Sequence, residues 1–418
     1  MHIVDFEKKH IEEATAIALE NYNEEKQVVN ELPQVNKIPD LDAFTGNGLS
    51  VAAFEGDRMV GFLCSCTPFD NAFRATDVRG VFSPMGAHGA IQENRAKIYA
   101  AMYQAVATKW VDAGAVSHAI CLYAHDEALQ YHFFQYGFGL RCLDAIRPLE
   151  IIPCEKCEGY EFEELQQEEF KFVYPLHLAL YEHYRESPFF MNRTPEAEEV
   201  FKMSSAEDEG RFFVARRKGE ICAFVKIAAT GETFVATGNT YRHIRGAYCL
   251  PEHRGKGLYQ NLLNFVIKTL KAEGYTELGV DFESFNPTAR GFWLKYFAPY
   301  THSVVRRIDE RILQVRGKRQ EKDIVFSAVT ACGECCVGCK KKEDGICQGC
   351  IESDGHCAEW TQSKGCPIHK CTRKHGVQFC GLCEEFPCEW LINKVVWRPN
   401  VVEELADLAR KYYEQKCK

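Results

Sequence analysis

The sequence lacks three features that would each have pointed to a broad class of protein. It has no uninterrupted apolar run of about 18 residues, so no membrane-spanning helix is predicted. It lacks an excess of basic residues, and the net charge of -9 argues against a general nucleic-acid binder. The amino terminus, MHIVDFEKKHIEEATA, lacks the apolar centre of a signal peptide. We therefore expect a cytoplasmic protein with neither a membrane nor a nucleic-acid partner.

The cysteines are numerous and unevenly placed. Twelve of the 21 lie between residues 331 and 390. Because thiols stay reduced in the cytoplasm, disulfides are not the expected explanation. The change in composition marks a domain boundary, and the charged segment VRGKRQEKD (315–323) is the predicted connector. A chain of 418 residues with 46% apolar residues is long enough for two or three domains.

A repeat with a period of 160 residues organises the first three hundred positions. The segment WVDAGAVSHAICLYAHDEALQYHFFQYGF (110–138) aligns without a gap on LKAEGYTELGVDFESFNPTARGFWLKYFA (270–298). Each copy predicts a helix, a glycine stop, a buried strand and a shorter helix that begins at a capping Asp or Asn. We therefore predict two α/β units of one fold, at residues 1–150 and 151–315.

Each copy also predicts a hairpin upstream of the long helix. The hairpin at 51–66 turns at Gly56-Asp57, and the hairpin at 212–227 turns at Lys218-Gly219. The fold class that follows is α/β (α+β), with two tandem mixed-sheet units and a small metal-stabilised cysteine-rich domain at 325–418 that ends in a helix.

The two copies differ where the long helix begins. In the second copy RGKGLY (254–259) precedes one apolar stripe, formed by Leu258, Leu262, Leu263, Val266, Ile267 and Leu270. In the first copy the aligned segment is NRAKIY (94–99), without glycine. The first amides of a helix are unpaired and bind phosphate where no side chain blocks the approach. The alternative is a basic turn whose glycines serve chain geometry alone.

The third segment has cysteine pairs at the spacing of metal ligands. It contains few large apolar residues, and metal–thiolate bonds can replace a core in so small a domain. We predict two zinc ions, with an iron–sulfur cluster as the alternative. The candidate ligands are Cys332, Cys336, Cys339, Cys347, Cys350, Cys366, Cys371, Cys380, Cys383 and Cys388, with Cys335, His356, His369 and His375 as possible replacements.

The glycine-rich loop and the helix after the next strand resemble the GNAT acyltransferase family. The family's acyl-CoA loop reads Q/R-x-x-G-x-G/A, which RGKGLY nearly matches, and its later N-x-x-A and aromatic positions match Asn286, Ala289 and Trp293. Tandem members in which only one half is active are known. The resemblance implies transfer of an acetyl group from acetyl-CoA to an amine by residues 151–315, with residues 1–150 as a degenerate unit.

The resemblance also implies the residues that would hold acetyl-CoA, and two of them depart from the family. The implied set is Leu250, Arg254, Gly255, Lys256, Gly257, Leu258, Tyr259, Asn286 and Trp293. Tyr259 stands where the family prefers Gly or Ala, so its ring must point away from the phosphates. Trp293 replaces a tyrosine that protonates the departing thiolate, so Tyr296 or Tyr248 is the candidate acid. Glu283 and Asp281, on one face of a predicted strand, are the candidate bases.

The function predicted is that of an N-acetyltransferase acting on a small-molecule or peptide amine. One alternative is a non-catalytic adaptor in which the GNAT fold is inactive and the zinc-bound tail docks a partner. The other is an acyltransferase that uses a longer acyl-CoA. The tail also resembles a cysteine-rich domain family of unknown function, which implies no activity. The oligomeric state and the acceptor stay open.

Overall fold

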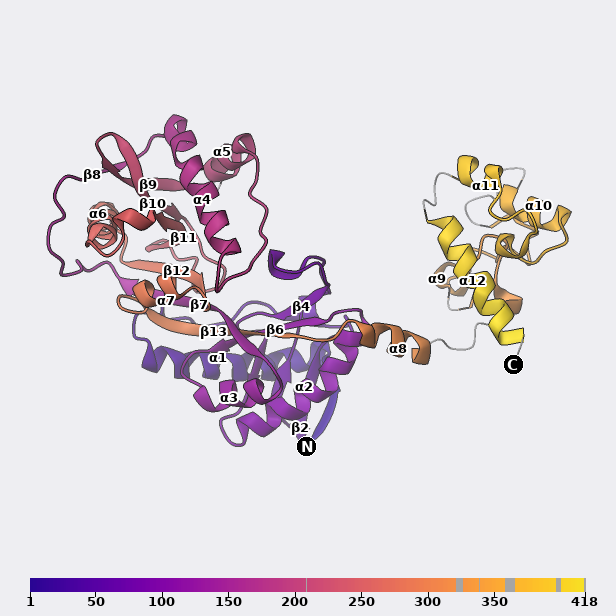
Figure 1. Ribbon diagram of the computed structural model, residues 1–418. Helices are drawn as coiled ribbons and strands as arrows, with labels where there is room; N and C mark the ends of the chain where they lie inside the picture. Colours follow the sequence, from indigo (N-terminus) through magenta and orange to yellow (C-terminus); the bar gives the residue numbers. More distant parts are fainter. Residues whose placement is uncertain (208, 321–325, 338, 358–364, 396–399, 417–418) are drawn as a thin grey trace. The chain divides into compact units, whose positions relative to one another are not determined.

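The computed structural model divides into two compact units, Met1–Gly317 and Lys318–Lys418. The first unit contains both copies of the repeat, and the second contains the cysteine-rich segment (Figure 1). The predicted connector at 315–323 spans the division. The residues that the structure describes are 1–207, 209–320, 326–337, 339–357, 365–395 and 400–416.

The helices and strands of the two repeats follow a similar order, although the first has an additional strand before its long helix and the second an additional helix. The first repeat contains β1 (His2–Asp5), α1 (Ile11–Val28), β2 (Val51–Glu55), β3 (Arg58–Leu63), β4 (Gly80–Ser83), β5 (His88–Ala90), α2 (Arg95–Asp112), β6 (Ser117–Tyr123), α3 (Glu127–Gln135) and β7 (Gly139–Pro148). The second contains β8 (Glu161–Glu164), α4 (Tyr174–Arg185), α5 (Glu198–Glu207), β9 (Arg211–Arg217), β10 (Glu220–Ala228), β11 (Tyr241–Cys249), α6 (Leu258–Ala272), β12 (Glu277–Glu283), α7 (Pro287–Trp293) and β13 (Ala298–Arg307), and α8 (Arg311–Gln320) follows it. Both ends of β12 lie 160 residues after the ends of β6.

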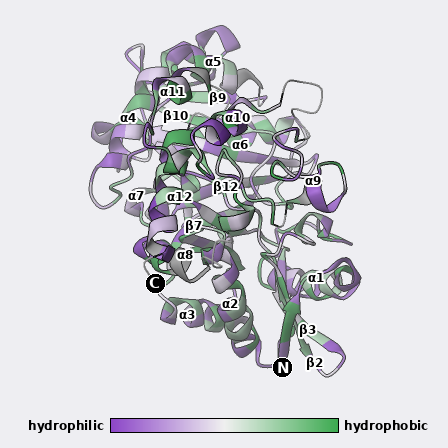
Figure 2. Ribbon diagram, turned by 90° about the vertical axis from the view of Figure 1, so that its right-hand side faces the viewer, coloured by the Kyte–Doolittle hydropathy of each residue, from purple (hydrophilic) through white to green (hydrophobic). Residues whose placement is uncertain are grey.

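The predicted hairpins and turns are present. The strands β9 and β10 are joined by Lys218 and Gly219, both with positive φ, as a two-residue hairpin turn requires. The strands β2 and β3 turn at Gly56, which also has positive φ, and β3 is coloured as mostly hydrophobic in Figure 2. Local turn chemistry therefore sets both hairpins.

The repeats exchange their last strands. Among the described strands, four form a sheet in the order β1-β2-β3-β5, and nine form a mixed sheet in the order β4-β6-β13-β7-β12-β11-β10-β9-β8. The strand β13 of the second repeat lies between β6 and β7 of the first, and β7 pairs with β12 of the second (Figure 1). The predicted α/β fold with mixed sheets is confirmed. The boundary at residue 150 stays a prediction about the repeat, since one sheet continues across it.

The helix α6 buries the stripe that the sequence predicts. Its buried residues include all six apolar positions from Leu258 to Leu270, and they pack on β9 to β12. The same core contains Leu143 and Ala145 of the exchanged strand β7. A first-repeat strand therefore completes the core beneath the second-repeat helix. None of the described helices combines the length and the apolar composition that a membrane span requires.

The second unit has a small apolar core of its own. Its helices are α9 (Lys340–Glu343), α10 (Pro367–Lys374), α11 (Glu389–Lys394) and α12 (Val401–Lys416). Phe379 and Leu405 are fully buried in this core, so α12 packs with its apolar side against the cysteine-rich segment. The amphipathic helix predicted at the end of the chain is thereby present.

Candidate functional site

The two glycines of RGKGLY are required by the backbone. Gly255 and Gly257 have φ of 72° and 71°, in the left-handed region that L side chains rarely adopt. Gly257 directly precedes α6, and an added Cβ at Gly255 would meet no other atom within 4 Å. The glycines are thus needed for the path of the chain, and they also leave the approach to the loop open.

The amides of this loop are free to bind an anion. Within the part of the chain that the structure describes, the main-chain amides of Gly255, Lys256 and Gly257 donate to no other residue. The first-turn amides of α6 likewise lack intrahelical acceptors, as at every helix start. Gly255 and Lys256 are exposed. The loop therefore presents a row of unpaired N–H groups at the positive end of a helix dipole.

A cavity of about 570 Å³ opens beside the loop. Its walls come from α4, the end of β11, the loop, the start of α6, and α7. The residues that line it are Leu180, His183, Ala247, Tyr248, Cys249, His253, Arg254, Gly255, Gly257, Leu258, Tyr259, Gln260, Asn286, Thr288, Ala289, Gly291, Phe292, Trp293 and Lys295. Of the nine residues predicted to hold acetyl-CoA, all but Leu250 and Lys256 are among them.

The two departures from the family pattern are accommodated in the core. The hydroxyl of Tyr259 donates to the carbonyl of Phe224 at 3.0 Å, so the ring points away from the loop amides, as expected. Trp293 is 4% exposed and packs edge-on against Tyr259 and Phe297. Asn286 caps α7 by accepting from the amides of Thr288 and Ala289 at 3.1 Å.

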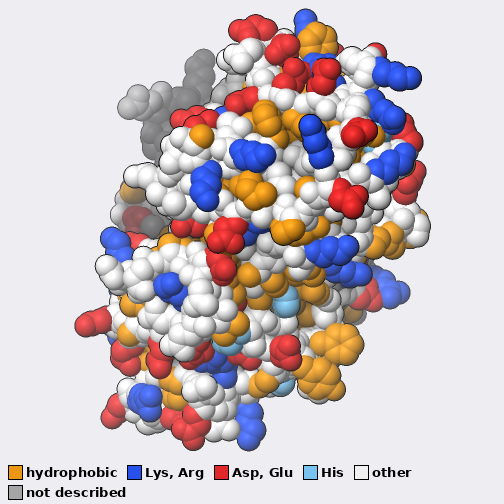
Figure 3. Space-filling model, turned by 90° about the vertical axis from the view of Figure 1, so that its left-hand side faces the viewer, with side chains coloured by type: hydrophobic (Ala, Val, Ile, Leu, Met, Phe, Trp, Pro, Cys, Tyr) orange, Lys and Arg blue, Asp and Glu red, His pale blue; other side chains and the backbone are white. Residues whose placement is uncertain are grey.

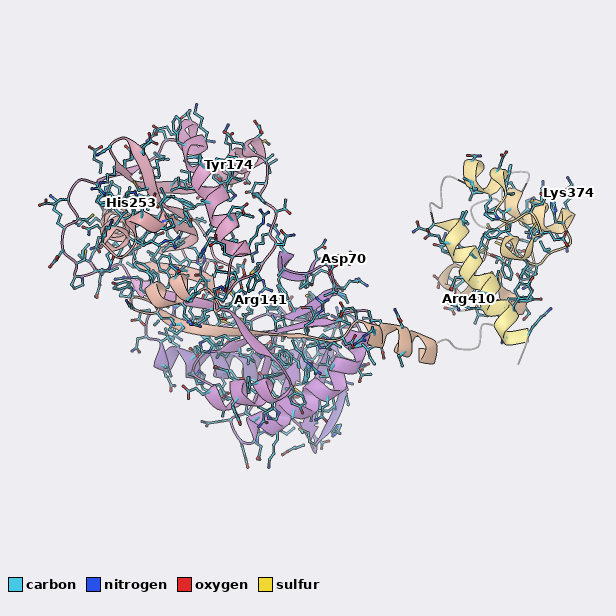
Figure 4. All side chains as sticks on the ribbon, in the orientation of Figure 1. Asp70, Arg141, Tyr174, His253, Lys374 and Arg410 are labelled. Carbon is cyan, nitrogen blue, oxygen red and sulfur yellow. The ribbon has the colours of Figure 1, made fainter. Side chains whose placement is uncertain are left out.

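Basic groups lie at the mouth of the cavity. The Arg254 guanidinium stands 5.3 Å from the centre of the Tyr248 ring and donates to the carbonyl of Cys249. His253 contacts the Tyr160 hydroxyl at 2.8 Å, and it is labelled in Figure 4. On the face seen in Figure 3, Lys and Arg side chains are interspersed with Asp and Glu. The positive charge at the mouth is thus a local feature.

The two tyrosines predicted as acids lie in different surroundings. Tyr248 lines the cavity, is 9% exposed, and burial raises the pKa of its hydroxyl. Tyr296 packs on Phe292 outside the cavity lining. Tyr248 is therefore the better placed of the two to give a proton to a group inside the cavity.

The two carboxylates of β12 share a face of the strand but have different partners. Glu283 accepts from Arg141 at 3.2 Å and from Arg193 at 2.8 Å through the same oxygen. Asp281 accepts from Nε2 of His243 at 2.8 Å. The sequence pointed to both acids, but it gave no sign of the two arginines, which lie 142 and 90 residues away along the chain.

The described cysteines of the second unit show no assembled metal site. Among the described residues, no group of three or more His, Cys, Asp or Glu side chains is arranged so that it could hold a metal ion. Cys366 and Cys380 lie in the apolar core with Ile368 and Phe379. Burial, together with the neighbouring thiols Cys371, Cys383 and Cys388, raises the pKa of Cys380 to about 12. Four of the predicted ligands thus lie near one another, and their role as metal ligands stays a prediction.

The cavity lies within the part of the chain that matches a known family. Residues 177–298 match the model of the Acetyltransferase (GNAT) family, so this segment resembles a GNAT acetyltransferase domain. The match includes most of α4 and all of the loop, α6, β12 and α7. The predicted GNAT resemblance is thereby confirmed for the second repeat, and the fold there is that of a GNAT acyltransferase.

Solved structures resemble the chain at low identity. A GCN5-related N-acetyltransferase from Sphaerobacter thermophilus shares 13% identity, with 73% of this chain and 95% of that chain covered and a TM-score of 0.46. A tandem GNAT protein from the clavulanic acid biosynthesis pathway shares 12% identity, with 73% and 98% covered and a TM-score of 0.39. A functionally unknown protein from Staphylococcus epidermidis shares 10%, with 60% and 92% covered and a TM-score of 0.37. A search of curated proteins gave no match.

Proposed function

We propose that the second repeat is an acetyl-CoA-dependent N-acetyltransferase. The observation that carries this proposal is the entrance to α6, where two glycines with positive φ leave three amides unpaired beside a cavity of about 570 Å³. These amides and Arg254 would bind the diphosphate of the cofactor. Ala247, Tyr248 and Cys249, on the open end of β11, would line the path of the pantetheine arm toward β12.

The chemistry needs a base, an acid and an amine acceptor. A carboxylate of β12 takes the proton of the amine, whose nitrogen then attacks the thioester carbonyl. The carbon–sulfur bond breaks, and Tyr248 would protonate the leaving sulfur. A primary amine of a small molecule or a peptide fits this chemistry. A cytoplasmic location stays a prediction.

Isothermal titration of the full chain with acetyl-CoA tests the proposal. We expect one site per chain, and we expect Gly257→Glu to weaken binding by about 100-fold or more, since it blocks and repels the diphosphate. Lys256→Glu, at an exposed position of ordinary backbone, should weaken binding without endangering the fold. Absence of binding by the wild type would favour the adaptor hypothesis. Tighter binding of a longer acyl-CoA in competition would favour the alternative donor.

Zinc in the cysteine-rich unit stays a separate proposal that rests on the C-x2-C spacing alone. Elemental analysis of protein purified without chelator measures it directly. We expect about two zinc ions per chain and a lower melting temperature after chelation, because metal binding stabilises such folds. Iron together with visible absorbance would instead indicate an iron–sulfur cluster. A metal-free chain that melts unchanged in chelator would overturn both.

A further inference from the structure

The strand β12 offers two carboxylates for proton transfer, and their surroundings differ in a way that selects one. Glu283 and Asp281 lie two residues apart on the same face of β12, while Phe282 between them lies in the apolar core on the other face. Both were predicted as bases. The question is which of them can gain a proton without losing its partners.

Glu283 is held by two guanidinium groups. Its Oε1 accepts from Arg193 at 2.8 Å and from Arg141 at 3.2 Å, and its side chain is only 14% exposed. Arg141 belongs to the exchanged strand β7, and it lies where the strands of the two repeats meet (Figure 4). Protonation would remove the negative charge that both arginines need. Glu283 is thus suited to anchoring β7 and the segment around Arg193.

Asp281 instead stands at the end of a chain of hydrogen bonds. Its Oδ1 bonds to Nε2 of His243 at 2.8 Å, and Nδ1 of His243 bonds to the Tyr241 hydroxyl at 2.6 Å. Burial holds the pKa of Tyr241 well above its ordinary value, so the hydroxyl stays protonated and donates to Nδ1. His243 must then carry its proton on Nε2 and donate to the carboxylate.

Two glycines leave the space that the hydrogen-bonded side chains of Tyr241 and His243 occupy. An added Cβ at Gly279 of β12 would lie 1.7 Å from the Tyr241 hydroxyl. An added Cβ at Gly231 would lie 2.6 Å from Nδ1 of His243. Both distances are far below contact, so any other residue would displace the ring. His243 and Tyr241 are 1% and 3% exposed, and their positions are fixed on every side.

Asp281 also lies at the point where β11 and β12 cease to pair. The parallel pairing of β11 and β12 ends at Ile244 and Val280, and the extra residue of a bulge, Arg245, follows in β11. Asp281 is the first residue of β12 beyond that point. Farther along β11, Ala247 and Tyr248 line the cavity. The side chain of Asp281 is 29% exposed, so a substrate can reach it.

We propose that Asp281 is the catalytic base of the acetyl transfer and that His243 and Tyr241 are positioning residues that aim its carboxylate. This assignment rests on the proposed function. The proton leaves the amine nitrogen for Oδ2 of Asp281, the nitrogen lone pair forms the bond to the acetyl carbon, and the carbon–sulfur bond breaks. The sulfur takes a proton from Tyr248, and solvent restores both groups.

The test compares Asp281→Asn with Glu283→Gln in the full chain. Release of the CoA thiol from acetyl-CoA is followed with a panel of primary amines (ethanolamine, lysine and spermidine) and with hydroxylamine, which is unprotonated at neutral pH. We expect Asp281→Asn to lower kcat by about 10²–10⁴-fold with the primary amines and far less with hydroxylamine. Glu283→Gln, which removes a structural anchor, should lower kcat less and by a similar factor with both kinds of acceptor. The acetyl-CoA Kd and the melting temperature of both variants show whether they fold.

The positioning role needs a readout that loss of structure would not produce. Tyr241→Phe and His243→Gln should shift the pH profile of kcat while the acetyl-CoA Kd stays unchanged. The pKa of Asp144, which burial raises to about 7, lies within the pH range of such a profile, so the profile is repeated in Asp144→Asn. Among the described residues, the titratable groups that bond to Asp281 or feel its charge include Cys142, Asp144, Tyr184, Glu232, Tyr241 and His243.

Each outcome decides between the assignment and the proposed function. Wild-type activity in Asp281→Asn, or an equal loss in Glu283→Gln, overturns the assignment and leaves the acetyltransferase intact. A wild type that binds acetyl-CoA but transfers to no probe contradicts transfer to small primary amines, and the assignment of Asp281 as their base with it. A wild type that binds no acetyl-CoA contradicts the proposed function at its first step.

Discussion

The entrances to the two long helices, α2 and α6, differ in whether they leave backbone amides free. In the second repeat α6 begins at Leu258, after two glycines with positive φ. In the first repeat α2 begins at Arg95, which aligns with Gly255, so the helix extends three residues farther toward its start. The amides of Arg95 and Lys97 bond to the carbonyls of Gln92 and Asn94. The first entrance therefore has no free row of donors at these positions.

A side chain also occupies the first entrance. The Arg95 guanidinium donates to Glu24 at 2.7 and 2.8 Å and to Asp126 at 3.2 Å. Asp126 caps α3 as Asn286 caps α7. The first repeat thus supplies its own charges where the second leaves room for a ligand. The absence of the two glycines and the presence of Arg95 with its two acidic partners accompany this difference.

The largest expected effect tests whether the repeats are one folding unit. Trp110→Ala in the first repeat should cost about 3–5 kcal/mol of unfolding free energy, and Leu270→Ala at the aligned position about 2–5 kcal/mol. Both side chains are fully buried. Because β7 and β13 are exchanged, we expect each variant to lower a single transition of the first unit, measured by denaturant unfolding. Separate transitions for the two repeats would contradict a shared core.

The second prediction gives the second repeat the residues of the first. The double substitution Gly255→Arg and Gly257→Lys should weaken acetyl-CoA binding by about 100-fold or more, since it blocks the amides and strains two residues with positive φ. Lys97→Ala, at the aligned exposed position of the first repeat, is the control and should leave the Kd unchanged. Calorimetry measures both. If Lys97→Ala weakened acetyl-CoA binding as much as the double substitution does, the result would contradict a binding site in the second repeat alone.

A smaller effect on stability is expected from a buried carboxylate on the exchanged strand β7. Burial, together with the charge of Asp281, raises the pKa of Asp144 on β7 to about 7. The folded state therefore holds a proton that the unfolded state releases near pH 4, and stability falls as the pH rises between these values. Asp144→Asn should raise the melting temperature at pH 8 and change it little at pH 4. If Asp144→Asn changed the melting temperature equally at pH 4 and at pH 8, the result would contradict an ionisation of Asp144 between these pH values.

The smallest expected effect separates the free-energy cost of the backbone conformation at Gly255 from the cost of steric contacts. Gly255→Ala should cost about 1–2 kcal/mol, because its φ of 72° disfavours any Cβ although no atom lies within 4 Å. Gly291→Ala in α7 is the matched control, since its added Cβ is equally free of contacts and its backbone is helical. We expect it to be neutral or stabilising by thermal melting. A loss as large as that of Gly255→Ala would contradict the backbone explanation.

The local features of the site could be predicted because a few neighbouring residues determine each of them. The apolar stripe of α6 follows from a spacing of three to four residues, and the left-handed loop follows from its glycines. The cap at Asn286 needs only the two amides that follow it. The zinc prediction was also local, but it required thiols to converge from distant positions. Among the described residues no group of three or more potential ligands is arranged to hold a metal, so the zinc site stays a prediction.

The sequence by itself determined the repeat, the hairpins, the helix with its glycine entrance, and the lining of the cavity by that entrance. Only the tertiary structure decided that β7 and β13 change places, that Arg141 and Arg193 neutralise Glu283, and that His243 holds Asp281. The physical reason is the separation along the sequence over which each effect acts. Backbone preferences and side-chain periodicity act over a few residues, whereas the side-chain contacts among these join residues 38 to 142 positions apart and form only when the sheet is assembled.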